Sequence, residues 1–382
     1  MSLICGITLD DRFIFFSFVS FKEGKFTLQR ETQLELNSGY SDLEDFIKIY
    51  IEDIDREIRN TENKYSFKTE SIFLGIPCDF IQSKVVEDLV PLGINREKKI
   101  TPQDIISAKK QIENIFLDWQ DYPLHNLVYH YEIEGRKFNT PPIGILAKRL
   151  KIKSLLIFTK SKLVEQFESA FDNFNRNFRG FIYDALCDLA SGFDGKEESA
   201  LLSIRIGYKK TRVSYFLNLQ LVKDRIFDFG EEEIIRNLSK ELSVSEDTAY
   251  RLIFYYSSFR NIFSSKEINI KDGDKYINLA SYSLNNFLKE KTKESLEKII
   301  FDLKQEIEIS ALTVNFLGRF TNIDGFSDFI KDTFSLNLKS SFNKSFSPSF
   351  GCVRYGVTRF LETLPRSTSL IRNIFKIYKD YF

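Results

Sequence analysis

The last thirteen residues separate apolar from basic side chains as a helix would, at about 100° per residue. The apolar side carries Leu370, Ile371, Ile374, Phe375, Ile377, Tyr378, Tyr381 and Phe382. The opposite, mainly basic side carries Arg372, Asn373, Lys376, Lys379 and Asp380. A cationic amphipathic helix with bulky aromatics is typical of an anchor in the membrane interface. Each basic residue adds about 1 kcal/mol on an anionic leaflet. The alternative left open by the segment itself is a final helix packed on the protein's own core.

Other chemistry-bearing residues are sparse. Neither His125 nor His130 has a cysteine or carboxylate at metal-ligand spacing, so surface or structural roles are favoured over zinc and over a Ser-His-Asp triad. No GxGxxG or Walker A sequence is present. Basic and acidic residues balance at 54 each, so no global field favours nucleic acid. Four dispersed cysteines indicate reduced thiols in a cytoplasmic protein, and no apolar run reaches the length of a membrane span.

The helices and strands that must position these residues form two series, one in each half of the chain. In the first we expect a strand hairpin at 3–21, strands at 25–36, 71–76, 124–133 and 150–158, and helices at 42–60, 101–117 and 161–174. Thr101 as N-cap and Pro102 as the first helical residue mark one helix start.

In the second series we expect a hairpin of 200–216 with 219–229, a strand at 312–316, and helices at 231–242, 246–254, 284–309, 325–334 and 350–364. Glu231, Glu232 and Glu233 are interpreted as a favourable acidic first turn of a helix. Because a strand hairpin opens each half, the pattern indicates a weak internal duplication and a two-lobed α/β fold.

Three segments also match motifs of a known family. Pro142-Ile143-Gly144-Ile145-Leu146, followed by Arg149-Leu150, is similar to the turn "NPxGmxgxrLe" of an inserted subdomain. The strands in 202–216, with Phe229-Gly230, are similar to a phosphate-binding hairpin, and Pro348-Ser349-Phe350 leading to Gly356 to a final helix before a membrane tail. On these motifs the chain resembles FtsA, a bacterial cell-division family of actin-like proteins, over nearly its whole length.

The resemblance implies an α/β, actin-like (actin/Hsp70 ATPase-type) two-lobed fold with an inserted α+β 1C subdomain and a C-terminal amphipathic helix. The implied parts are 1–83, 163–198 and 346–364 (1A), 84–162 (1C, SHS2-like), 199–228 and 286–345 (2A), 229–285 (2B), a linker at 365–369 and the membrane-targeting helix at 370–382.

The chain departs from the family at the nucleotide site. Thr8 replaces an aspartate of the first phosphate loop, and Arg205 and Arg212 replace the two aspartates of the second. Tyr208 and Phe320 replace glycines and are expected to crowd the cleft. Since Mg²⁺ needs oxygen ligands and phosphate needs a close backbone approach, we expect no metal site, no catalytic residue and no ATP hydrolysis. The degenerate site implied by the resemblance comprises Thr8, Arg205, Gly207, Lys209, Lys210, Thr211, Arg212 and Gly318.

Two interpretations of this site stay open. Arg205, Lys209, Lys210 and Arg212 could bind phosphate in place of Mg²⁺, so ATP is the cofactor that could still bind. Alternatively, the site is collapsed and salt-bridged, and the protein has no cofactor. Alternation along the strand puts Arg205 and Gly207 on one face, which limits how many bases converge.

The implied function is a non-catalytic cell-division scaffold that tethers FtsZ filaments to the cytoplasmic face of the inner membrane at the division site. Its implied partners are the C-terminal peptide of FtsZ, other division proteins through 1C, further copies of itself and anionic lipids, with no nucleic acid. Lys240, Arg251 and Arg260 of 2B are candidates for an acidic peptide.

Two competing functions remain. A PilM-like assembly protein of a type IV pilus or secretion system shares this architecture, but that family typically lacks the terminal amphipathic helix. A sugar or acetate kinase-like ATPase is disfavoured by the lost aspartates.

Overall fold

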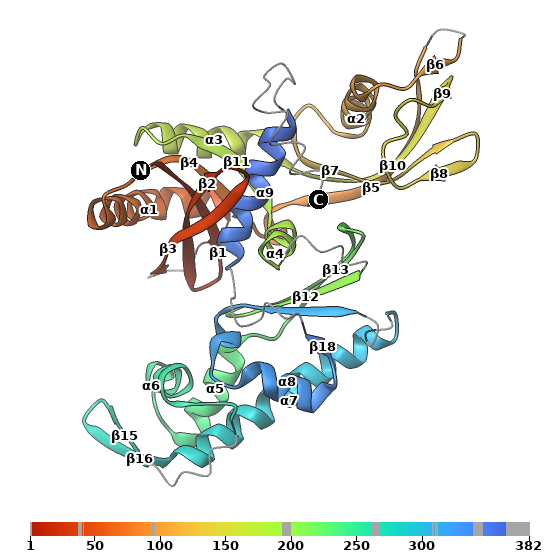
Figure 1. Ribbon diagram of the computed structural model, residues 1–382. Helices are drawn as coiled ribbons and strands as arrows, with labels where there is room; N and C mark the ends of the chain where they lie inside the picture. The colour runs from red at the N-terminus through yellow and green to blue at the C-terminus, as the bar shows by residue number, and fades with distance from the viewer. Residues whose placement is uncertain are drawn as a thin grey trace. The chain divides into compact units, whose positions relative to one another are not determined.

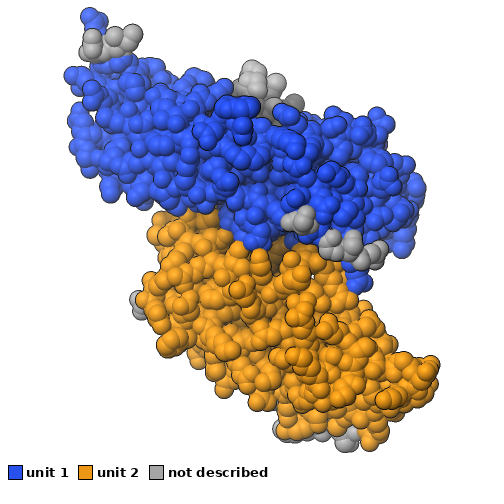
Figure 2. Space-filling model, turned by 180° about the vertical axis from the view of Figure 1, so that it is seen from behind, with its two compact units in different colours: residues 1–9, 14–187, 349–380 blue, residues 10–13, 188–348, 381–382 orange. Residues whose placement is uncertain are grey.

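The computed structural model describes residues 2–36, 40, 42–93, 96–192, 200–260, 267–307, 309, 312–338 and 347–363. These residues form two compact units, coloured separately in Figure 2. Within the described residues, unit 1 takes 2–9, 14–187 and 349–363, and unit 2 takes 10–13 and those from 188 to 348. The division therefore falls between 187 and 188, inside a helix. No helix in the described ranges is long and apolar enough to cross a bilayer.

A five-stranded mixed sheet forms the frame of unit 1. Its order is β11 (Phe178–Tyr183), β4 (Lys68–Ile76), β1 (Ser2–Leu9), β2 (Phe13–Lys22) and β3 (Lys25–Glu35). Strand β1 pairs antiparallel with β2 and parallel with β4. Helices α1 (Leu43–Tyr65) and α3 (Ser161–Asp172) contact each other, and α9 (Pro348–Thr363) packs against the sheet (Figure 1). Gly6 permits that packing, because a Cβ there would stand 2.0 Å from the Ser349 carbonyl oxygen.

A second sheet lies within the segment expected to form the inserted subdomain. Its order is β5 (Gln82–Pro91), β10 (Arg149–Lys160), β7 (Asp121–Ile133) and β8 (Arg136–Phe138), next to a short ladder of β6 (Lys98–Lys99) and β9 (Leu146–Ala147). Helix α2 (Pro102–Phe116) begins at the expected residue with a full Thr101/Asp104 capping box. It packs its buried Ile105, Ala108 and Ile112 on the sheet residues of a separate hydrophobic core. A single 3₁₀ turn, η1 (Cys78–Phe80), precedes β5.

Unit 2 is built on another five-stranded sheet, with the order β14 (Gln220–Phe227), β13 (Thr211–Leu217), β12 (Ala200–Ile206), β17 (Thr313–Leu317) and β18 (Asn337–Leu338). Its helical segments are α5 (Glu231–Leu242), α6 (Glu246–Arg251), the π-helical η2 (Leu252–Tyr256), α7 (Ser281–Lys304), the 3₁₀ turn η4 (Arg319–Asn322) and α8 (Phe326–Phe334). A hairpin of β15 (Glu267–Asp272) and β16 (Lys275–Ala280) completes the unit, and α4 (Asp184–Gly192) contains the division.

Several element predictions need correction. The segment 200–216 is not one strand but two, β12 and β13, because the chain reverses at 207–210, so the second hairpin is a three-stranded meander. Strands β5, β11, β15 and β16 and helix α4 were missed. In β15 Ile268 and Ile270 are the apolar residues, and in β5 apolar residues fall on both faces, since Val85 and Leu89 are exposed and Val86 and Val90 buried. Neither strand therefore gives a long alternating signal.

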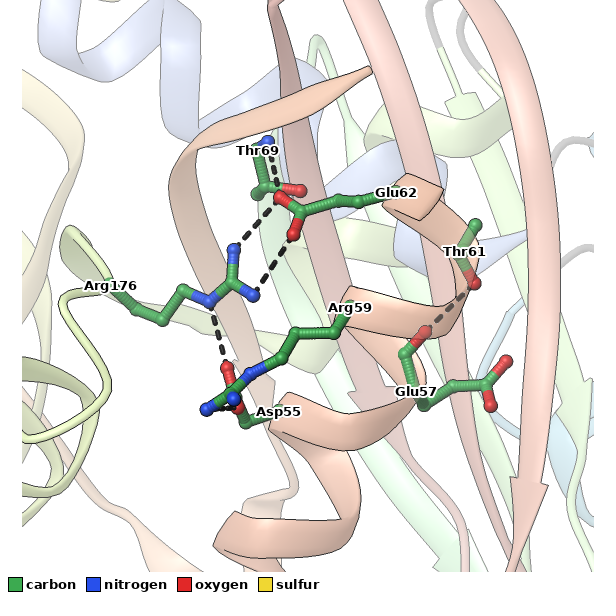
Figure 3. Close-up of polar contacts among 7 residues, drawn as sticks. All are labelled: Asp55, Glu57, Arg59, Thr61, Glu62, Thr69 and Arg176. Atoms are coloured by element: carbon green, nitrogen blue, oxygen red, sulfur yellow. Dashed lines mark hydrogen bonds and ion pairs between the residues drawn. The ribbon is translucent and has the colours of Figure 1, made fainter. Parts of the chain in front are cut away.

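A buried ionic network fastens the α3–β11 connection to α1 in unit 1. Arg176 donates through Nε to Asp55 (2.8 Å) and through its two terminal nitrogens to Glu62 (2.8 and 3.0 Å), as Figure 3 shows. Glu62 also accepts from the backbone N–H of Thr69 (2.6 Å). Burial is the largest single effect and would raise the pKa of Glu62, but the hydrogen bonds from Arg176 and Thr69 and the charge of Arg176 together outweigh it, and the pKa is lowered. Arg59 pairs with the other oxygen of Asp55.

Candidate functional site

Of the expected nucleotide-site residues, Thr8 alone belongs to unit 1. It is fully buried on β1, opposite Gly75 of the parallel strand β4. A Cβ on Gly75 would meet the Thr8 methyl group at 2.7 Å and an Asp184 carboxylate oxygen at 3.0 Å. Thr8 is therefore packed in the interior of the sheet.

The two arginines that replace aspartates lie side by side in unit 2. Arg205 of β12 and Arg212 of β13 are directly opposite in the antiparallel register, and both are buried. Arg205 lies 3.5 Å from a carboxylate oxygen of Asp188, and Arg212 lies 3.9 Å from one of Asp224. Carboxylates from other elements therefore offset both guanidinium charges within the unit.

The turn between β12 and β13 carries the remaining residues of the second phosphate motif. Lys209 and Lys210 are exposed there, whereas Thr211 is buried and donates to the Phe229 carbonyl oxygen (2.8 Å). The Gly207 N–H donates to the Lys210 carbonyl oxygen (3.0 Å) and closes the turn. The four basic residues thus divide into a buried, ion-paired pair and an exposed pair.

Asp10 is a site residue that the sequence reasoning missed. Its carboxylate accepts from the Tyr208 backbone N–H (3.0 Å), so the turn 10–13 is held against the β12–β13 turn. Burial raises the pKa of Asp10, and the Arg205 guanidinium partly opposes that rise. The motif comparison placed the lost aspartate at Thr8, two positions earlier, and so overlooked a carboxylate at the hairpin tip.

Gly318 is the last of the expected nucleotide-site residues along the chain. Its φ is +108°, and a Cβ would stand 2.1 Å from the Ile206 carbonyl oxygen. Only glycine combines this backbone conformation with so close an approach. The close contact between the end of β17 and the end of β12 therefore explains the glycine at position 318 without a bound ligand.

The next residue, Arg319, lies among aromatic rings of unit 2. Its guanidinium carbon is 4.2 Å from the ring centroids of Phe13 and Phe254 and 4.9 Å from that of Tyr250. It also donates to the Tyr250 hydroxyl (2.5 Å) and to a Glu231 carboxylate oxygen (2.8 Å). An arginine over aromatic faces gains about 2 kcal/mol or more when desolvated.

Glu231 is the buried carboxylate partner of Arg319. It stands in the acidic first turn of α5, as predicted, and its side chain is 3% exposed. Burial raises the pKa of Glu231 to about 7 against the attraction of Arg319, and the Asp10 carboxylate adds to the rise. Its neighbour Glu232 instead pairs with Arg236 one turn along the helix (2.9 Å).

A second arginine joins the same group. Arg12 lies 4.5 Å from the ring centroid of Tyr250 and 5.3 Å from that of Tyr208. We call Arg12, Phe13, Tyr208, Glu231, Tyr250, Phe254 and Arg319 the arginine–aromatic cluster. It joins the turn 10–13, the β12–β13 turn and η4, the three segments that the resemblance assigns to nucleotide.

Phe320 is not part of this cluster. It is fully buried in the unit 2 core, with its ring centroid 5.8 Å from that of Phe259 and 6.1 Å from that of Phe326. The expectation that Phe320 would crowd a cleft is therefore wrong, because the side chain turns into the core.

Two carboxylates of this part of unit 2 are shifted by their surroundings. Burial raises the pKa of both Asp10 and Glu231. Among the residues that the structure describes, no group of three or more His, Cys, Asp or Glu side chains could hold a metal ion.

The three basic candidates for partner binding differ in surroundings. Lys240 is exposed in the last turn of α5. Arg251 donates to Thr248 (2.8 Å) and to the Lys271 carbonyl oxygen (3.1 Å). Arg260 is exposed and pairs with Asp324 at 2.8 Å. The three therefore form no single cluster of uncompensated charge.

The two histidines lie on β7. His125 is buried, and its Nε2 accepts from the Tyr183 backbone N–H (2.9 Å), while Arg359 of α9 lies 2.7 Å from Nδ1. Burial, with Arg359 adding to it, lowers the pKa of His125 well below its usual value. His125 thus links β7, β11 and α9. His130 is half-buried. The linker 365–369 and the amphipathic helix 370–382 lie outside the described residues.

Comparison with known proteins places the fold. No protein-family model matches the chain. Cell division protein FtsA of Streptococcus pneumoniae is 20% identical over 291 residues, which are 74% of this chain and 63% of that protein. The structure of a PilM–PilN type IV pilus biogenesis complex matches with a TM-score of 0.58 at 10% identity, over 93% of this chain and 98% of that one. The ethanolamine utilization protein EutJ of Carboxydothermus hydrogenoformans matches with a TM-score of 0.52 at 9% identity, over 92% and 90%.

These likenesses define the class of protein. The chain has the α/β actin-like fold, as expected from its motifs. Within that class it has a weak sequence relationship to FtsA, and it spans about 63% of that relative's length.

Proposed function

We propose that this chain is a non-catalytic, FtsA-like scaffold that tethers FtsZ filaments to the cytoplasmic face of the membrane and recruits other division proteins. The observation that carries the non-catalytic part is the arginine–aromatic cluster. Its members fill and cross-link, with their own charges, the segments that would otherwise receive nucleotide. The relationship to a cell division protein supports the cellular role, and the amphipathic segment 370–382 supports peripheral attachment.

The energetics favour the collapsed interpretation of the site over phosphate binding. A nucleotide in contact with η4 would have to displace Arg319 from Glu231 and from three aromatic rings. Separating a buried ion pair typically costs about 3–5 kcal/mol. That cost would cancel a large part of the binding free energy of a ligand with a micromolar Kd, which is roughly 8 kcal/mol.

We therefore expect MgATP to leave this protein unaffected. At 2 mM MgATP the melting temperature should shift by less than about 1 °C, because a ligand stabilises only when its concentration exceeds its Kd. Differential scanning fluorimetry and a phosphate-release assay measure this. A saturable shift with a micromolar midpoint would contradict the collapsed site, and phosphate release above background would contradict the pseudo-ATPase proposal.

The second candidate function is a PilM-like assembly protein, favoured by the match to the PilM–PilN complex over nearly the full length of both chains. The two functions differ in what the last residues do. In the scaffold they bind lipid, and in the assembly protein the chain binds a membrane partner without them.

Deleting the terminal helix is expected to abolish attachment of FtsZ filaments to membranes. The full chain should pellet with vesicles containing 30% anionic lipid and recruit FtsZ polymers to them, whereas a chain ending at Pro365 should stay in the supernatant. The deleted segment carries four cations, Arg366, Arg372, Lys376 and Lys379. Because each adds about 1 kcal/mol of binding to an anionic surface, the binding should depend on salt. Sedimentation at 50 and 500 mM salt measures this.

The matched control is Lys298→Glu in the full chain, which changes one exposed charge on α7, outside the tail and outside the candidate partner-binding residues. If the full chain binds lipid but not FtsZ polymers, the pilus-type function moves ahead of the scaffold. If the chain ending at Pro365 pellets as well as the full chain, the anchor is contradicted.

A further inference from the structure

Positive charge is concentrated at one end of the segment 84–162, which we call the insert. The proposed function gives these charges no role. In Figure 1 the β6–β9 ladder and β8 lie at the end of the insert sheet farthest from β1 and β2. Within 96–104 and 134–149, seven exposed basic side chains face three carboxylates, although the whole chain is neutral. The basic residues are Arg96, Lys98, Lys99, Arg136, Lys137, Lys148 and Arg149, and the carboxylates are those of Glu97, Asp104 and Glu134.

Two large aliphatic side chains project from the same place. Ile143 is 52% exposed and Leu146 is 60% exposed, while Ala147 beside it is 2% exposed. Because side chains alternate along a strand, Ile145 and Ala147 pack toward the α2 core and Leu146 and Lys148 point away from it. Lys99 is directly opposite Leu146 in the ladder. We call Lys99, Ile143, Leu146 and Lys148 the insert tip.

The backbone fixes the tip in shape. The Gly144 N–H donates to the Ile100 carbonyl oxygen (2.8 Å), and the Ile100 N–H donates to that of Ile145 (2.9 Å). Gly144 has a φ of +90°, a conformation that favours glycine, and the Ile143 side chain before it is exposed. The tip is therefore a hydrogen-bonded protrusion.

We propose that the insert tip is a second membrane contact, which places Ile143 and Leu146 in the interface of an anionic bilayer with Lys99 and Lys148 on the headgroups. Protruding aliphatic side chains flanked by lysines suit the surface of an anionic bilayer. The aliphatic groups enter the acyl-chain region, and the lysines meet the negatively charged headgroups. An acidic peptide fits less well, because β6 and β9 are two residues long and offer almost no strand edge to extend. The proposal deepens the membrane attachment in the proposed function, but it does not depend on residues 370–382.

The test uses the full chain and vesicles of phosphatidylcholine with 30% phosphatidylglycerol. The tip variant combines Leu146→Glu with Lys148→Glu. The matched control combines Phe301→Glu with Lys298→Glu on α7, which also changes one exposed lysine and one exposed apolar residue. A tail variant, Ile374→Glu with Tyr378→Glu, separates the two contacts.

The tip variant is expected to lower the partition coefficient at least about ten-fold at 50 mM salt, in both the natural and the tail-variant background. One cation near an anionic surface is worth a factor of about five (about 1 kcal/mol), and reversing it and removing a leucine add to this. The control should change the coefficient by less than about two-fold. A polarity-sensitive dye on Leu146→Cys should shift to the blue on these vesicles, and the same dye on Phe301→Cys should not.

Unchanged binding of the tip variant, or a dye at position 146 that stays in water, overturns the proposal. If the tip variant instead loses binding to polyglutamate alone, the surface serves an acidic polypeptide and the lipid contact is wrong. If the tail variant abolishes vesicle binding and the tip variant does not, the proposed function stands and this inference fails. If the tip variant abolishes it and the tail variant does not, the tail anchor fails and the insert tip stands.

Discussion

Arg176→Ala is expected to destabilise unit 1 by about 3–5 kcal/mol, because it leaves two carboxylates buried without their shared cation. Arg176 binds Asp55 and Glu62, two turns apart on the same face of α1, and its side chain is 9% exposed. Its loss would release the α3–β11 connection from α1. Hydrogen exchange of α1 peptides in mild urea measures the change within unit 1.

Arg59→Ala is the matched control. Arg59 also pairs with Asp55, but its side chain is 57% exposed, and an exposed pair contributes about 0–1 kcal/mol. A triple variant, Asp55→Asn with Glu62→Gln and Arg176→Met, should recover much of the stability, because it removes the buried charges together. Equal exchange in Arg176→Ala and Arg59→Ala would show that the network contributes nothing beyond surface pairing.

The second large effect is expected from Arg319→Ala, which should destabilise unit 2 by about 3–5 kcal/mol. The change deprives Glu231 of its ion-pair partner and leaves a gap among Phe13, Tyr250 and Phe254. Methylguanidinium fits that gap and carries the missing charge. At 10 mM it should raise the melting temperature of Arg319→Ala by several degrees and leave the natural protein unchanged.

Arg236→Ala is the control for this variant, since Arg236 forms an exposed pair with Glu232 in the same helix. It should lose less than about 1 kcal/mol and gain nothing from methylguanidinium. No rescue of Arg319→Ala, with hydrogen exchange showing a folded unit 2, would mean that the cluster does not bind the guanidinium group as the contacts indicate.

The same carboxylate gives unit 2 a defined pH dependence. The pKa of Glu231 is raised from 4.5 to about 7 on folding, so the folded state binds a proton more tightly than the unfolded state. Its contribution to stability is therefore complete below about pH 4.5 and is lost as the pH rises through 7. Between pH 5 and 8 this amounts to roughly 2–4 kcal/mol, and Glu231→Gln should flatten that part of the profile.

Local signals in the sequence were sufficient for much of the frame. Thr101 and Pro102 start α2 where expected, because a cap and a proline act on their own helix turn. The apolar period of α1 likewise predicted that helix, apart from a C-terminal extension to Tyr65. The motifs at 142–150 and 202–230 predicted the actin-like fold, which structural comparison confirms.

What the sequence left ambiguous are contacts between distant segments. Glu231 has the appearance of an ordinary first-turn acid until Arg319, 88 positions away, is placed beside it. The identity of Arg205 and Arg212 predicted the loss of a metal site, but their placement opposite each other on adjacent strands follows from the β12–β13 register.

The sequence by itself determined the residue types at the degenerate site, the separated faces of the last thirteen residues and the order of most elements. Only the tertiary structure decided that Arg319 lies among aromatic rings, that Phe320 turns into the core, and that Lys99 and Leu146 share an exposed face. The reason is physical. Capping and periodicity act within a few residues, whereas burial, ion pairing and pKa depend on which segments the fold brings within a few ångströms of each other.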